Sequence, residues 1–208
     1  MRKIIDKLLV IITISVAMIF VISSFFINLV VPKDIDSENG LVFGNKKAKV
    51  TLVVFEDFKC KYCKEYFNEL FPVIKTEYVD TKKIKYVIIP IAFINGSKLL
   101  SNAAIAIYEL KKDKFFEFLK IISEKKTKNI TKQELIEIVA TLDGINLEIF
   151  EDILDQKVFN NYLEENLVYA QKVMPKFEVP SMYINGHMVD FENIINNLEE
   201  QLNYREFK

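Results

Sequence analysis

The stretch KVTLVVFEDFKCKYCKEYF, residues 49–67, decides the fold. Its first part, residues 49–56, is short, apolar and rich in β-branched residues, which predicts a buried central strand. Apolar residues then follow at helical spacing from Cys63 onward. The two cysteines of the chain, Cys60 and Cys63, therefore stand at the start of a predicted helix, directly after a strand.

This cysteine pair suits thiol–disulfide exchange better than the alternatives. Two thiols and the distant His187 are too few for a closed four-ligand zinc site, so we expect no metal and a surface histidine. A structural bridge between such close cysteines would constrain the unfolded chain little. At a helix N-terminus, however, unpaired N–H groups and the helix dipole stabilise a thiolate, the nucleophile in exchange. We expect Cys60 to be exposed and acidic and Cys63 to be buried.

The composition sets limits on the class of protein. Of the 208 residues 50% are hydrophobic, enough for one core and a membrane segment. The net charge is −1, so nothing favours attraction to nucleic acid. Two cysteines are also too few for a small secreted scaffold held together by disulfides.

An uncharged run, residues 8–31, lies near the N-terminus. As a helix rising ~1.5 Å per residue it would measure roughly 36 Å, enough to cross a hydrocarbon core of about 30 Å. Because Arg2, Lys3 and Lys7 precede it, the positive-inside rule places the rest of the chain outside the cytoplasm. We expect residues 1–31 to form an uncleaved signal anchor, with a cleaved signal peptide as the alternative.

The rest of the chain predicts an order of strands and helices. Residues 32–40 are polar and predict a linker, and residues 84–90 predict a second buried strand parallel to the first. Between these strands, Pro72 is expected to kink the helix rather than to start it. Residues 97–174 have helical periodicity, and residues 181–189 predict a hairpin. A final helix is expected after the hairpin, capped by Asp190.

Two of these motifs resemble one family. GNKKAKVTLVVFEDFKCKYCKEYF, residues 44–67, resembles the start of bacterial DsbA-like thioredoxin-fold proteins, and VPSMYING, residues 179–186, resembles their cis-proline loop and the following strand. The helical block between them resembles the helical domain that this family inserts. The resemblance implies an α/β thioredoxin fold over residues 41–208 with a helical insertion at about 97–174, preceded by an N-terminal transmembrane segment.

The resemblance also implies roles for individual residues. Cys60 would be the attacking nucleophile, Cys63 the resolving cysteine, and the two would form the redox-active disulfide. Pro180 would follow a cis peptide bond and face the cysteines, and Val179 would offer its backbone to an extended substrate. No cofactor and no metal are implied.

Departures from the family pattern concern the groups that tune the cysteine pKa. Lys61 replaces the usual proline between the cysteines, and Val54 stands where many thioredoxin-fold proteins keep a buried carboxylate. Glu56 and Asp57 are nearby and are candidates for tuning the pKa and handling protons, although a solvated carboxylate is an equal alternative.

The resulting functional hypothesis is a protein-disulfide oxidoreductase that donates the Cys60–Cys63 disulfide to exported proteins and is reoxidised by a membrane protein. It would face the periplasmic side of a bacterial inner membrane, or be free in the periplasm after cleavage. Lys59, Lys61 and Lys64, the helix N-terminus and the absence of a carboxylate at Val54 favour the oxidase direction. A reductase or isomerase of the same fold, or a non-catalytic tethered chaperone or metal carrier, are the alternatives.

Overall fold

The computed structural model describes residues 12–22, 35–125 and 129–206. The chain divides into two units, Met1–Lys33 and Asp34–Lys208. In the first unit, residues 12–22 form a helix. Within the described ranges no helix has both the length and the apolar character that a membrane span requires. The predicted anchor falls partly on residues 1–11 and 23–31, which lie outside the description.

The second unit is built around a five-stranded sheet with the order β1-β3-β2-β4-β5. Strands β2 and β3 are parallel and all other pairs are antiparallel. In the middle of the sheet, Val53 of β2 lies between Val87 of β3 and Tyr183 of β4. The strands are β1 (Leu41–Gly44), β2 (Thr51–Glu56), β3 (Lys85–Pro90), β4 (Ser181–Ile184) and β5 (His187–Val189).

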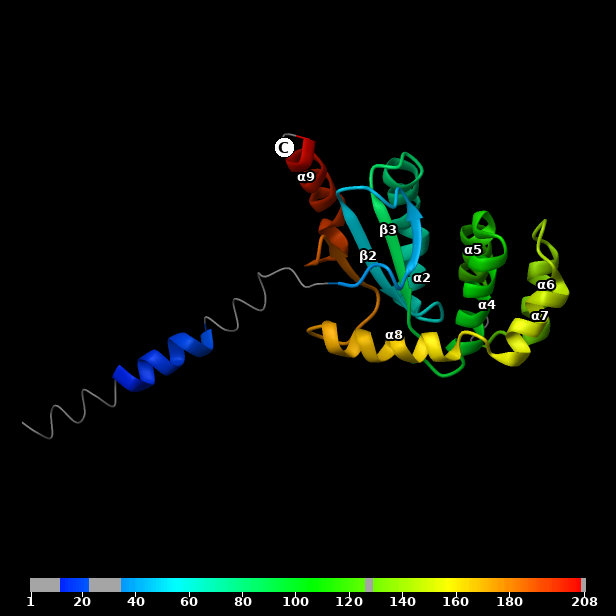
Figure 1. The fold of residues 1–208 in the computed structure, drawn as a ribbon, viewed down its shortest axis with the longest axis horizontal. Helices are drawn as coiled ribbons and strands as arrows, with labels where there is room; N and C mark the ends of the chain where they lie inside the picture. The colour runs from blue at the N-terminus through cyan, green and yellow to red at the C-terminus, as the bar shows by residue number, and fades with distance from the viewer. Residues whose placement is uncertain (1–11, 23–34, 126–128, 207–208) are drawn as a thin grey trace, which may run out of the picture. The chain divides into compact units, whose positions relative to one another are not determined.

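Helices connect these strands in the order of a thioredoxin fold with an inserted helical domain. Helix α2 follows β2, α4–α8 form the insertion between β3 and β4, and α9 closes the chain (Figure 1). The insertion matches the predicted range of 97–174. The helices are α2 (Lys61–Glu69), α3 (Phe71–Ile74), a π-helical turn (Lys75–Val79), α4 (Ser97–Leu110), α5 (Phe115–Glu124), α6 (Lys132–Ala140), α7 (Leu147–Gln156), α8 (Asn160–Val173) and α9 (Ile194–Glu206).

The two faces of the sheet support separate apolar clusters, because side chains alternate along each strand. Leu52 and Val54 of β2 belong to the cluster that includes α3, α9 and much of the insertion. Val53 and Phe55 belong to the other, which contains both cysteines and Ala170 of α8. The cysteines are therefore packed on the sheet face that α8 contacts.

Three local predictions differ from the structure. Pro72 does not kink a continuous helix: α2 ends at Glu69, and Pro72 lies in the first turn of α3, where its missing N–H has no helical partner to lose. Asp190 makes no side-chain cap, and a 3₁₀ turn (Phe191–Asn193) precedes α9. Strand β1 was not predicted, because it is short and is stabilised by antiparallel pairing with β3.

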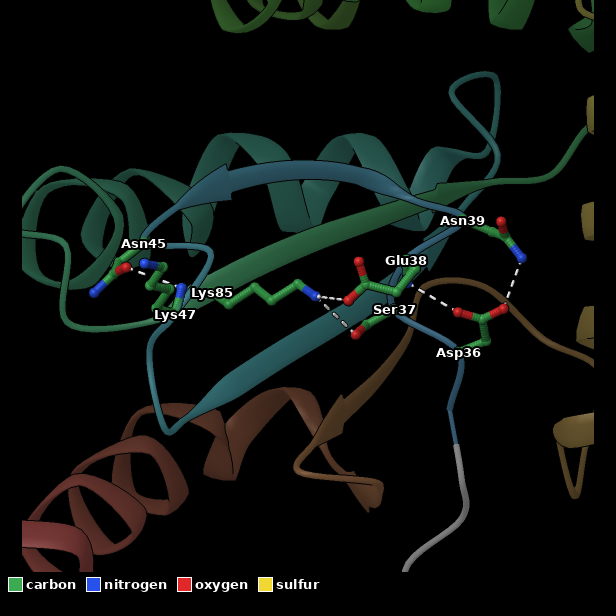
Figure 2. Close-up of polar contacts among 7 residues, drawn as sticks. All are labelled: Asp36, Ser37, Glu38, Asn39, Asn45, Lys47 and Lys85. Carbon is green, nitrogen blue, oxygen red and sulfur yellow. Dashed lines mark hydrogen bonds and ion pairs between the residues drawn. The ribbon is translucent and has the colours of Figure 1, made fainter.

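The C-terminal end of the predicted linker is attached to the sheet. The Lys85 ammonium, with 8% of its side chain exposed, contacts the Glu38 carboxylate at 2.7 Å and the Ser37 hydroxyl at 3.0 Å (Figure 2). Asp36 accepts hydrogen bonds from the Glu38 backbone N–H and the Asn39 side chain, as Figure 2 also shows. Ser37 and Glu38 of the predicted linker are therefore held against β3 by Lys85.

Candidate active site

The first cysteine lies where β2 ends and α2 begins. Cys60 is the N-cap of α2, with an extended backbone and no side-chain cap. Its N–H donates to the Asp57 carbonyl at 2.8 Å, and its own carbonyl accepts from the Lys64 N–H at 3.1 Å. This turn directs the first N–H groups of α2, those of Tyr62 and Cys63, at the Cys60 sulfur.

The two free thiols have opposite protonation preferences. A hydrogen bond from the Cys63 thiol, together with the backbone N–H groups of Cys63 and Tyr62, lowers the pKa of Cys60 to about 6, although burial and Asp57 oppose this shift. Burial, the hydrogen bond with Cys60 and the Glu56 carboxylate raise the pKa of Cys63 far above its ordinary value. At neutral pH Cys60 is therefore the thiolate and Cys63 the thiol.

Cys60 is less accessible than the sequence led us to expect. Only 9% of its surface is exposed, against 2% for Cys63. The covering group is the loop before β4, where the Val179–Pro180 peptide bond is cis, as the family resemblance implies. The Val179 carbonyl oxygen lies 3.7 Å from the Cys60 sulfur, so the prediction of an exposed Cys60 is wrong.

A buried carboxyl group stands close to the cysteine pair. Glu56 is two residues after Val54 on β2, so both side chains point to the same face of the strand. Burial raises the pKa of Glu56 to about 8, although a hydrogen bond from the Tyr86 hydroxyl at 3.5 Å opposes the shift. The Tyr86 and Tyr66 hydroxyls are 3.1 Å apart, and sequence analysis identified neither tyrosine. Glu56, one of the two carboxyl groups that the sequence named as candidates for pKa tuning, is therefore buried and not solvated.

A small cavity adjoins this carboxyl group. It measures about 20 Å³ and is lined by Glu56, Cys63, Lys64 and Ser123, among other residues. This is space for about one water molecule. Glu56 and Cys63 thus border one small cavity between α2 and α5, whose remaining lining is largely apolar.

Asp57 has a structural position rather than a solvated one. It is fully buried, and one carboxylate oxygen accepts from the backbone N–H groups of Phe93 at 3.1 Å and Ile94 at 3.0 Å. The other oxygen accepts from the Lys59 N–H at 2.9 Å. Burial raises the pKa of Asp57, and these hydrogen bonds oppose the shift. Asp57 therefore holds the turn before Cys60 against the loop after β3.

The lysines around the motif are engaged elsewhere. The Lys61 side chain is 79% exposed and pairs with Glu65 at 3.3 Å. The Lys59 ammonium donates to the Asn95 carbonyl and to the Asn129 side chain. The groups that lower the pKa of Cys60 are the Cys63 thiol and the backbone N–H groups of Tyr62 and Cys63, and not these cations.

A groove that sequence analysis missed lies beside the cis-proline loop. It has a volume of about 500 Å³ and is formed by the outer face of α2, residues 178–182 and the β5 strand with the turn that follows it. Helical spacing on α2 was the available signal, since Tyr62, Glu65 and Glu69 fall on one face. The groove separates this face of α2 from Pro180 and Phe191.

The described residues contain no group of three or more His, Cys, Asp or Glu side chains that could hold a metal ion. His187 is exposed in β5. Dithiol chemistry therefore rests on the two cysteines and the groups around them.

Several known proteins are similar to this chain. A family model described as thioredoxin matches residues 36–204. A probable disulfide bond formation protein D from Bacillus anthracis is 31% identical over 167 residues, which cover 76% of each chain. Among solved structures, oxidised BdbD from Bacillus subtilis is 26% identical, with a TM-score of 0.73 over 83% of this chain and 98% of that one. Chlamydia trachomatis DsbA, 22% identical, shares the fold with a TM-score of 0.72 over 86% and 96% of the two chains.

Proposed function

The chain belongs to the thioredoxin family as a DsbA-like thiol:disulfide oxidoreductase, and from this premise we propose that it is an extracytoplasmic oxidase that donates the Cys60–Cys63 disulfide to exported proteins. The observation that carries the proposal is the low pKa of the Cys60 thiol at the N-terminus of α2. Whatever stabilises that thiolate stabilises the reduced protein, and a stabilised reduced form makes the disulfide a stronger oxidant.

The proposed reaction transfers two electrons from substrate to enzyme. A substrate thiolate attacks the Cys60 sulfur, the Cys60–Cys63 bond breaks, and Cys63 leaves and takes up a proton. A second thiolate of the substrate then attacks the substrate sulfur that is bonded to Cys60. This releases Cys60 as a thiolate. The substrate gains a disulfide, one of its two thiol protons passes to solvent, and the other restores the group that protonates Cys63.

Glu56 is the proposed proton source for Cys63. With a pKa of about 8 it is largely protonated at neutral pH, and it borders the same small cavity as the Cys63 thiol. Asp57 is proposed to act indirectly, by holding the turn that places Cys60. Lys61 has its ion pair with Glu65 and is left with a weak, solvent-screened influence on the sulfur.

Pro180 and Val179 are proposed as the substrate platform. The cis-proline loop lies directly over Cys60, and the groove begins on its other side. An exported segment that contains cysteine would lie along this loop with its sulfur at Cys60.

The cellular setting is also a proposal. The uncharged run at residues 8–31, preceded by basic residues, supports an anchor at residues 1–31, a linker at 32–40 and a catalytic domain at 41–208 facing the periplasm. A membrane reoxidase would return Cys60 and Cys63 to the disulfide.

Redox titration of the purified protein against glutathione tests the proposal. We expect a midpoint clearly more oxidising than the value of about −270 mV typical of thioredoxin. A midpoint as reducing as thioredoxin would contradict the oxidase and favour a reductase. If the purified protein shows no thiol exchange, a chaperone would be favoured. If it retains metal after purification under reducing conditions, a metal carrier would be favoured.

A further inference from the structure

The groove beside the cis-proline loop has an apolar floor. Tyr62, Met188 and Phe191 line it and are 63%, 44% and 38% exposed. Single exposed apolar residues are ordinary on a protein surface, but these three come from two separate segments, α2 and β5 with the turn that follows it, and border one hollow. A groove of about 500 Å³ has room for several side chains of an extended peptide.

The rim of the same groove is acidic. Glu65 and Glu69 come from α2, Glu178 from the loop before Pro180, and Asp190 from the residue after β5. None of the residues that line the groove in the described structure is basic. Four carboxylates therefore converge on one apolar surface.

Neighbouring cations neutralise only part of this charge. Lys61 pairs with Glu65 at 3.3 Å, and Lys176 pairs with Glu178 at 2.5 Å. Within the described part of the chain, Glu69 and Asp190 have no ion pair. The groove keeps a negative potential although the whole chain is close to neutral, with a net charge of −1.

We propose that this groove selects cysteine-containing segments in which Lys or Arg stands close to the reacting cysteine, an inference that rests on the proposed oxidoreductase function. Lys and Arg fit the surface as a whole, since their aliphatic stems cover apolar groups while the charged ends reach carboxylates. The Tyr62 ring can also interact with a cation, as the Lys61 ammonium 5.8 Å from the ring centroid shows.

The position of the groove relative to the sulfur supports this selection. Val179 contacts the Cys60 thiol and also lines the groove, so one residue separates the reacting atom from the binding surface. A segment whose cysteine reaches Cys60 therefore brings its next residues over Tyr62 and toward Glu69 or Asp190.

The test measures oxidation of short synthetic peptides by the full chain in its disulfide form. Three peptides share two cysteines and differ only in the flanking residues, which are Lys, Gln or Glu. At low ionic strength we expect the Lys peptide to react roughly three to ten times faster than the Gln peptide, and the Glu peptide to be slowest. High salt should reduce the differences.

A matched pair of double variants separates the groove from the overall charge. Glu69→Gln with Asp190→Asn removes two charges from the rim, whereas Asp152→Asn with Glu165→Gln removes two exposed charges from the insertion. We expect the first variant to lose most of the preference for Lys and the second to keep it. A preference that is absent, or that is equal in both variants, overturns the inference.

The reaction with glutathione distinguishes this outcome from failure of the proposed function. Glutathione is too small to span the groove, and the Asp152→Asn with Glu165→Gln control should react with it at the wild-type rate. If the wild-type protein exchanges with glutathione but shows no charge preference, the groove inference is wrong and the oxidoreductase function stands. If the wild-type protein exchanges with neither glutathione nor the peptides, the proposed function itself is contradicted.

Discussion

The Cys63 thiol donates a hydrogen bond to the Cys60 sulfur, and this one contact shifts the two pKa values in opposite directions. It is the first cause of the low pKa of Cys60 and adds to the effect of burial on Cys63. The pair is therefore polarised before any substrate arrives.

Removing the donor should raise the pKa of Cys60. In Cys63→Ala the Cys60 pKa should move from about 6 toward the ordinary value of 9.0, with the backbone N–H groups of α2 limiting the change. Thiolate absorbance in the ultraviolet during a pH titration measures this shift. An unchanged pKa would mean that the helix terminus alone stabilises the thiolate.

The two cysteines should also differ in reactivity. Cys60→Ser should abolish disulfide exchange, whereas Cys63→Ser should accumulate mixed disulfides through Cys60, because the resolving thiol is absent. Alkylation of the reduced protein at neutral pH should modify Cys60 first. Peptide mapping that finds Cys63 modified first would reverse the assignment.

Burial of Glu56 should make stability depend on pH. Its folded pKa of about 8 exceeds the ordinary 4.5, so the folded state binds more protons between these values and loses stability as pH rises through this window. Glu56→Gln removes this dependence, so its stability relative to wild type should increase from pH 4.5 to pH 8. Chemical denaturation of both proteins in the disulfide form measures the difference without interference from Cys60.

Asp57 should matter mainly for the loop after β3. Asp57→Ala leaves the partly buried N–H groups of Phe93 and Ile94 without their acceptor, which should cost about 1–3 kcal/mol. The exposed Asp143→Asn is the matched control and should change the unfolding free energy by less than about 0.5 kcal/mol. Equal effects in the two variants would show that the Asp57 hydrogen bonds carry no stability.

The proposed anchor predicts that the full-length protein fractionates with membranes and faces outward. Fractionation with protease accessibility in intact cells checks both points. A soluble extracytoplasmic form whose N-terminus lies between residues 24 and 33 would show cleavage instead.

The sequence predicted the parts of the fold that depend on local pattern. The strand–helix junction, the second strand and the hairpin were all readable, because each is set by residues close together in the chain. The low exposure of Cys60 could not be predicted from the sequence, because it depends on Val179, which is 119 residues away. The acidic groove needs segments from three parts of the chain, and no single stretch signals it.

Glu56 is an intermediate case. The position expected to carry a carboxylate, Val54, is apolar and buried, and the nearby Glu56 gave no sign from composition that it was buried. The two-residue period of a strand would have placed both on one face. What the sequence lacked was the packing of Tyr66 and Tyr86 that encloses it.

The hydrogen bond between the buried Cys60 and Cys63 side chains also affects how the reduced protein reacts with peroxide. A thiolate with a pKa of about 6 reacts with peroxides and forms a sulfenic acid. Here the Cys63 thiol is already hydrogen-bonded to that sulfur, so condensation to the disulfide with loss of water competes with further oxidation to irreversible sulfinic acid. Peroxide would thus convert the reduced enzyme into its disulfide form and regenerate it instead of inactivating it.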